Sequence, residues 1–80
     1  MAFTITIVEE AASRGVVASG TKKVKGSSVV YEWEVEAFTD GTYQLYINGD
    51  WEADFKSVKE CRVYVKRLAE STAEMVAVDK

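Results

Sequence analysis

The side chains of this chain that are most capable of chemistry are carboxylates spaced two residues apart. They form two groups: Glu32, Glu34 and Glu36, and then Asp50, Glu52 and Asp54. Because alternate residues of a β-strand point to the same face, each group would form a row on a sheet, with about 6.6–6.8 Å between neighbours. Such rows could serve acid–base catalysis, hold a metal ion, or present negative charge to a partner at a spacing comparable to that of nucleic-acid phosphates.

Catalysis and metal binding are the less favoured uses. The chain has no histidine, so it lacks the most common general base and metal ligand. Parallel side chains on a flat sheet do not converge around an ion, and enzymes place acid–base pairs in clefts rather than on open faces. Cys61 lies on an apolar helical stripe and is interpreted as a small buried hydrophobe. We therefore expect no catalytic residue, no metal site and no cofactor, and a protein that is not an enzyme.

The elements that must position the carboxylates follow from periodicity. Alternation predicts strands over residues 3–8 and, most strongly, over 29–38, with a weaker strand over 16–25 interrupted by Gly20. Residues 9–15 are expected to form a turn or short helical loop. The segments "TDGT" (39–42) and "INGD" (47–50) indicate two hairpins with a short strand between them, and "WEADF" (51–55) supplies the next strand.

The alternation also predicts the turn types. At the first hairpin, a three-residue loop, 39–41, pairs Ala37 with Tyr43 and Val35 with Leu45, so that apolar residues share a face. A two-residue loop would place polar residues opposite apolar ones. The same reasoning predicts a three-residue loop over 47–49, with Trp51 opposite Leu45.

A capping box, Ser57 to Glu60, begins a helix whose apolar stripe packs on the sheet. The stripe comprises Val58, Cys61, Tyr64, Val65 and Leu68. The pattern leaves open whether residues 71–80 extend this helix or fray. The predicted fold class is α+β: one domain over residues 1–80, an antiparallel meander of four to five strands with one C-terminal helix on one face.

With both tryptophans turned toward the helix, the other face would carry the carboxylates. Its expected partner-binding residues are Glu32, Glu34, Glu36, Tyr46, Glu52 and Asp54, with Tyr46 as the central anchor. The alternatives are a solvated polar face, as antiparallel sheets often have, and metal capture. We favour a small binding protein, an inhibitor that docks on a basic, nucleic-acid-binding surface of a partner.

A second hypothesis uses the opposite charge. Lys59, Arg62, Lys66 and Arg67 lie on the polar side of the predicted helix, and Lys22, Lys23 and Lys25 lie on the second predicted strand. These side chains could contact a phosphate backbone, form a self-association face, or simply be solvated. A net charge of −3 argues against nucleic-acid binding over the whole surface.

The remaining composition sets the cellular context. The chain has 80 residues and one cysteine, and its N-terminus lacks the basic region and cleavage site of a signal peptide. No apolar run approaches the ~20 residues of a membrane span. We expect a soluble cytoplasmic protein, monomeric or homodimeric.

Residues 29–68 carry a resemblance to known domains. The aromatic strand "YEWEVEAF", the "DG" turn and the spacing of Phe55, Ser57 and Glu60 resemble AP2-like domains at the N-termini of some phage-type integrases. The resemblance implies a three-stranded sheet with one helix and DNA binding through a basic sheet face, whereas this chain has an acidic one. In size, acidity and lack of catalytic groups, the chain is also similar to the small inhibitors that phages direct against host nucleic-acid enzymes.

Overall fold

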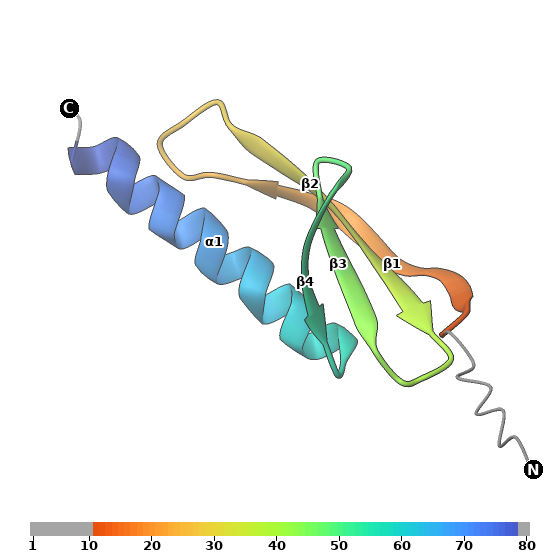
Figure 1. Ribbon diagram of the computed structural model, residues 1–80. Helices are drawn as coiled ribbons and strands as arrows, with labels where there is room; N and C mark the ends of the chain where they lie inside the picture. The colour runs from red at the N-terminus through yellow and green to blue at the C-terminus, as the bar shows by residue number, and fades with distance from the viewer. Residues whose placement is uncertain (1–10, 79–80) are drawn as a thin grey trace, which may run out of the picture.

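The computed structural model describes residues 11–78, and four strands precede one helix in that range (Figure 1). The elements are β1 (Ser13–Lys23), β2 (Val30–Phe38), β3 (Tyr43–Ile47), β4 (Asp50–Phe55) and α1 (Val58–Val78). The strands form one antiparallel sheet in the order β1-β2-β3-β4. The predicted α+β meander is thus confirmed, with four strands in the described residues.

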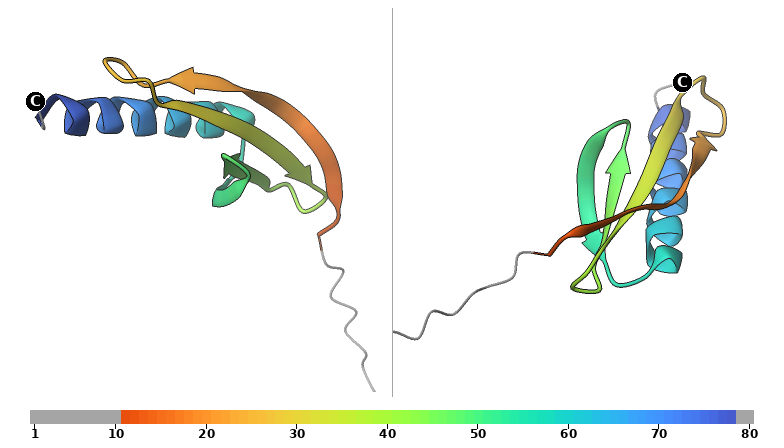
Figure 2. Two further views of the ribbon diagram at one scale, coloured as in Figure 1. Left: turned by 90° about the horizontal axis from the view of Figure 1, so that it is seen from above. Right: turned by 90° about the vertical axis from the view of Figure 1, so that its right-hand side faces the viewer.

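The helix covers one face of the sheet, and no element within residues 11–78 covers the other (Figure 2). Its C-terminal half runs alongside the β1–β2 hairpin, beyond the end of the shorter β3–β4 hairpin. Each residue on the sheet therefore faces either α1 or solvent, and the register decides which.

The hydrophobic core lies between the sheet and α1. Val35, Leu45 and Cys61 are fully buried, and Ile47 and Val65 complete the cluster. Partly buried side chains pack around it: Ala18, Tyr31, Trp33, Tyr43, Phe55, Val58, Tyr64 and Leu68. The apolar stripe predicted for the helix and the interpretation of Cys61 as a buried hydrophobe are confirmed. Burial raises the pKa of the Cys61 thiol, which keeps the side chain neutral.

The first hairpin has the predicted three-residue loop. Ala37 pairs with Tyr43 and Val35 with Leu45. The Gly41 amide donates to the Phe38 carbonyl over 3.1 Å, and Gly41 takes the left-handed φ of 86°. Glycine adopts this conformation without steric cost, so the "DG" signal selects the turn and its register.

The second hairpin differs from the prediction. Its loop has two residues, Asn48 and Gly49, both with positive φ (53° and 85°), and Ile47 pairs directly with Asp50. Asn48 fits this turn because it continues the ladder on β2: its amide donates to the Glu32 carbonyl (2.7 Å), and its Oδ1 accepts from the Glu32 amide (3.0 Å). Asn-Gly is also the sequence most favoured for such a turn.

A bulge at Glu52 compensates for the shorter loop. Trp51 pairs with Tyr46 and Ala53 with Leu45, which leaves Glu52 as the extra residue of β4. The predicted pairing of Trp51 with Leu45 is therefore wrong. The bulge returns Ala53 to the helix-facing side, but it leaves Trp51 on the other side.

The first described strand starts earlier than predicted. β1 begins at Ser13, so residues 13–15 belong to a strand and not to a turn or helical loop, and it ends at Lys23 instead of residue 25. Its register shifts between Ser13 and Gly15 and again between Val16 and Ala18, whereas the expected irregularity at Gly20 is absent from this ladder. The strand predicted over residues 3–8 lies outside the described residues.

The capping box forms at the start of α1. The Glu60 amide donates to Ser57 Oγ (3.2 Å), and Glu60 Oε2 accepts from the Lys56 amide (3.0 Å), one residue before the expected cap. At the other end the helix continues to Val78, which settles the conformation of residues 71–78. The Thr72 hydroxyl lies 2.9 Å from the Tyr31 hydroxyl and joins this half of the helix to β2.

The close approach of β1 to an aromatic ring predicts a cost for any side chain at Gly20. A Cβ added there would lie 3.0 Å from Cζ2 of Trp33. We expect Gly20→Ala to destabilise the protein by about 1–3 kcal/mol in urea unfolding, because the Trp33 ring must move within a packed layer. Ser19→Ala, on the opposite face of the same strand, is the control and should change stability by less than about 0.5 kcal/mol. Equal stability of the two variants would contradict this packing.

Candidate binding surface on the open face of the sheet

The open face is built from cross-strand rows whose members the register places side by side. One row contains Glu34, Tyr46 and Trp51, and the next contains Glu36, Gln44 and Asp54. Directly paired residues share a face of the sheet. We call these six residues, together with Glu32, the open face.

Tyr46 lies at the centre of this surface, as the sequence predicted. Its hydroxyl donates to Gln44 Oε1 over 2.7 Å. Partial burial and the negative charges of Glu36 and Asp54 raise the pKa of the Tyr46 phenol, so the hydroxyl remains a neutral hydrogen-bond donor among acidic groups.

Trp51 is the residue that sequence reasoning placed incorrectly. It was expected beneath the helix, but 58% of its surface is exposed on the open face. Its indole Nε1 donates to Asp54 Oδ1 over 2.9 Å, which orients the ring beside a carboxylate. The Asn-Gly dipeptide was the signal that could have placed it, because the two-residue turn it favours sets Trp51 opposite Tyr46.

Two of the predicted carboxylates do not join the open face. Glu52, the bulged residue, turns toward the helix, where its Oε1 accepts from the Tyr64 hydroxyl over 2.6 Å. This hydrogen bond, with partial burial, raises the pKa of the Tyr64 phenol. Asp50 pairs with the buried Ile47, so it lies on the helix-facing side of the sheet. The acidic row expected on β4 is therefore wrong, because the two-residue turn places Asp50 and Glu52 on the helix-facing side and the bulge returns only Asp54 to the open face. The row of Glu32, Glu34 and Glu36 on β2 keeps its predicted face.

Four carboxylates remain on the open face: Glu32, Glu34, Glu36 and Asp54. Two of them accept hydrogen bonds from neutral side chains: Glu36 from the Ser13 hydroxyl and Asp54 from the Trp51 indole. These four carboxylates share the surface with two aromatic rings, Tyr46 and Trp51. Val16, which pairs with Glu36 and is 57% exposed, adds an apolar border on β1.

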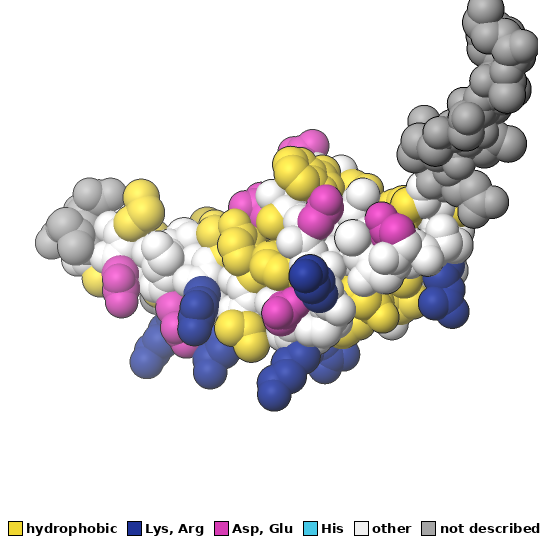
Figure 3. All heavy atoms as spheres, turned by 60° about the horizontal axis from the view of Figure 1, so that its bottom comes forward, with side chains coloured by type: hydrophobic (Ala, Val, Ile, Leu, Met, Phe, Trp, Pro, Cys, Tyr) yellow, Lys and Arg dark blue, Asp and Glu magenta, His cyan; other side chains and the backbone are white. Residues whose placement is uncertain are grey.

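The basic residues of α1 lie on the other side of the molecule. Lys59, Arg62, Lys66 and Arg67 are all exposed on α1, and Figure 3 shows Lys and Arg side chains along one margin of that side. The Arg62 guanidinium lies 5.9 Å from the centroid of the Trp33 ring, a cation–π contact that steadies it. Lys22, Lys23 and Lys25 line a cavity against the C-terminal half of the helix, but Glu70 and Glu74 line it as well.

Two further site types were searched for in the described part of the chain. Within it, no group of three His, Cys, Asp or Glu side chains could hold a metal ion. Residues 11–78 also contain no helix with the length and apolar character needed to cross a membrane.

Comparisons with known proteins give no relative for this chain: no family model matches it, and neither does any curated protein or solved structure.

The different exposure of the two tryptophans can be measured by fluorescence quenching. Trp51 lies on the open face and Trp33 packs against the core. We expect acrylamide to quench the fluorescence strongly in the wild type and in Trp33→Phe, and weakly in Trp51→Phe. Weak quenching in Trp33→Phe, in which Trp51 is the remaining tryptophan, would instead indicate that β4 follows the three-residue loop.

The Tyr64–Glu52 hydrogen bond predicts a pH dependence. Because the folded pKa of Tyr64 lies above its unfolded value of about 10, this bond stabilises the fold fully below pH ~10, and its contribution is lost as pH rises through the folded pKa. Glu52→Gln should lower the pKa of Tyr64 in an absorbance titration at alkaline pH, with Tyr64→Phe identifying its signal. Glu70→Gln serves as the control, and an identical titration in Glu52→Gln and wild type would exclude the hydrogen bond.

Proposed function

We propose that this chain is a small non-catalytic binding protein whose open face docks on a basic, nucleic-acid-binding surface of a partner protein. By covering that surface it acts as an inhibitor, a nucleic-acid mimic of the type that phages use. The observation that carries the proposal is the exposure of Trp51 and the central position of Tyr46 among four carboxylates on one face.

The combination of aromatic and acidic side chains supports binding over simple solvation. Solubility is served by charge alone, and an exposed tryptophan on a sheet face works against it. Tryptophan and tyrosine are the residues that most often dominate binding energy at protein interfaces. Trp51 and Tyr46 are cross-strand neighbours, so they form one contact area with Glu34 at its edge.

The charge distribution suits a basic partner. The negative groups of the open face would attract a cationic surface over about a Debye length and orient the molecule before contact. The aromatic side chains would then supply the short-range burial that holds the complex. On this division of roles, removing a carboxylate mainly slows association, and removing Trp51 mainly speeds dissociation.

Nucleic-acid binding through the helix is the second candidate function. Exposed Lys59, Arg62, Lys66 and Arg67 favour it, and the contact of Arg62 with Trp33 gives one of these cations a fixed position. The open face itself is unsuited to a phosphate backbone because its charge has the same sign.

Charge reversal on each side of the molecule distinguishes the two functions. Poly-L-lysine serves as the basic probe and a mixed-sequence single-stranded DNA as the acidic one. We expect poly-L-lysine to bind at low salt and to protect Trp51 from acrylamide, with affinity reduced about tenfold in Glu34→Lys. Glu74→Lys, an equal change in charge on the exposed side of α1, should lower affinity by less than about twofold.

The natural partner can then be identified by a photo-crosslinking amino acid at position 46. A basic nucleic-acid-binding protein crosslinked from this position, but not in Glu34→Lys, would support the proposal. Equal losses in Glu34→Lys and Glu74→Lys would overturn it, because binding would then follow net charge alone. Micromolar DNA binding that is lost in Arg62→Glu would establish the second function instead.

A further inference from the structure

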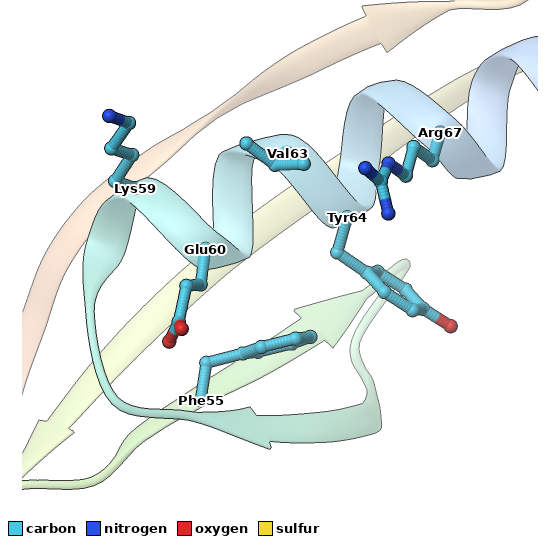
Figure 4. Close-up of a pocket in the computed structure, with 6 residues that line it drawn as sticks. All are labelled: Phe55, Lys59, Glu60, Val63, Tyr64 and Arg67. Carbon is cyan, nitrogen blue, oxygen red and sulfur yellow. The ribbon is translucent and has the colours of Figure 1, made fainter.

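A groove of about 320 Å³ lies between the first half of α1 and the end of β4, away from the open face (Figure 4). It is lined by Phe55, Lys59, Glu60, Val63, Tyr64 and Arg67. Most of this lining is apolar. Val63 is 40% exposed, whereas Val65 of the same helix is buried in the core. The groove therefore offers apolar surface that no residue of the described range 11–78 covers, beside charged groups.

The aromatic walls of the groove are held in place. The Phe55 and Tyr64 rings pack at 5.4 Å between centroids with an interplanar angle of 53°. The Tyr64 ring is also fixed at its far end by the hydroxyl that donates to Glu52. A site with walls already ordered loses little conformational entropy when a ligand enters.

Two of the three charged side chains that line the groove, Lys59 and Arg67, are basic. The side chain of Arg67 extends from the helix toward the space between Val63 and Tyr64 (Figure 4), and Lys59 lies two turns away, about 12 Å along the axis. Glu60 is the acidic member, but its carboxylate accepts from the Lys56 amide at the positive end of the helix. Arg67 is thus the group available to bind a carboxylate, by two parallel hydrogen bonds.

We propose that this groove binds an acidic peptide segment of a partner protein through one apolar side chain. The apolar side chain lies against Val63 and against the wall formed by the rings of Phe55 and Tyr64, and a neighbouring carboxylate of the peptide pairs with Arg67. Charge complementarity selects this occupant, because the apolar pocket and the cation beside it match a hydrophobic residue flanked by acids. The site is separate from the open face, so the chain could connect a basic and an acidic partner.

The test uses a short fluorescein-labelled peptide in which one phenylalanine lies between pairs of acidic residues, with binding followed by fluorescence polarisation. We expect Arg67→Glu to weaken binding about tenfold or more, since it removes the carboxylate partner and adds repulsion. Lys66→Glu makes the same change in charge at the neighbouring exposed position outside the groove and should weaken binding less than about twofold. Val63→Glu should abolish binding, and a peptide with alanine in place of phenylalanine should bind about as weakly as Arg67→Glu binds the original.

Each variant position is exposed on α1, so circular dichroism should show the wild-type helix content throughout. Glu34→Lys should leave peptide binding unchanged, which keeps this result independent of the proposed function of the open face. Equal losses in Arg67→Glu and Lys66→Glu, or no effect of the phenylalanine, would overturn the proposal. So would displacement of the peptide by single-stranded DNA, which would indicate a phosphate site. The proposal would also be overturned if the mass of the protein in solution increased with its concentration and Arg67→Glu abolished this increase, because the occupant would then be a second copy of this chain.

Discussion

The burial of Val35 and Leu45 against Cys61 and Val65 is the constraint that the rest of the structure obeys. All four have little or no exposed surface, and they join the two central strands to the helix. Burying one such side chain is worth about 1.5–3 kcal/mol, whereas a charged pair on the surface contributes about 0–1 kcal/mol. Hydrophobic burial therefore sets the register of β2 and β3, and their intervening residues must point to solvent. The acidic and aromatic character of the open face follows from that choice.

The β4 strand shows how a local preference and the core can be satisfied together. Asn48 and Gly49 favour a two-residue turn, and a regular ladder after it would have placed Glu52 opposite the buried Leu45. The bulge at Glu52 removes this conflict, because Ala53 takes that position and the Glu52 carboxylate reaches the Tyr64 hydroxyl instead. The turn sets Trp51 on the open face, and the bulge sets Asp54 on the same face and orders one wall of the groove beside α1. One extra residue thus affects both candidate binding surfaces.

The two sides of the molecule differ in charge and in shape. The open face is acidic and aromatic, while the helix side is basic and carries a groove with apolar walls. Cys61, the most reactive side-chain type in the chain, is fully buried in the core between these sides. Both candidate sites therefore consist of surface groups suited to recognition, held on a helix or on paired strands. Such rigid elements keep the contact residues in a fixed arrangement, which favours binding through complementarity.

The sequence by itself determined the fold class, the first hairpin with its register, the start of the helix, and the outward direction of Glu32, Glu34, Glu36 and Tyr46. These features depend on short-range alternation, on a glycine at a defined turn position, and on a capping box, all of which can be recognised within a few residues. The position of Trp51, the direction of Glu52 and the groove beside Phe55 were decided by the tertiary structure. In β4 the alternation favoured a three-residue loop and the Asn-Gly dipeptide a two-residue turn. The choice between these conflicting local signals depended on ladder bonds between Asn48 and Glu32 and on the fit of Ala53 beneath the helix. Contacts between segments so far apart in the chain leave no periodic signal in the sequence.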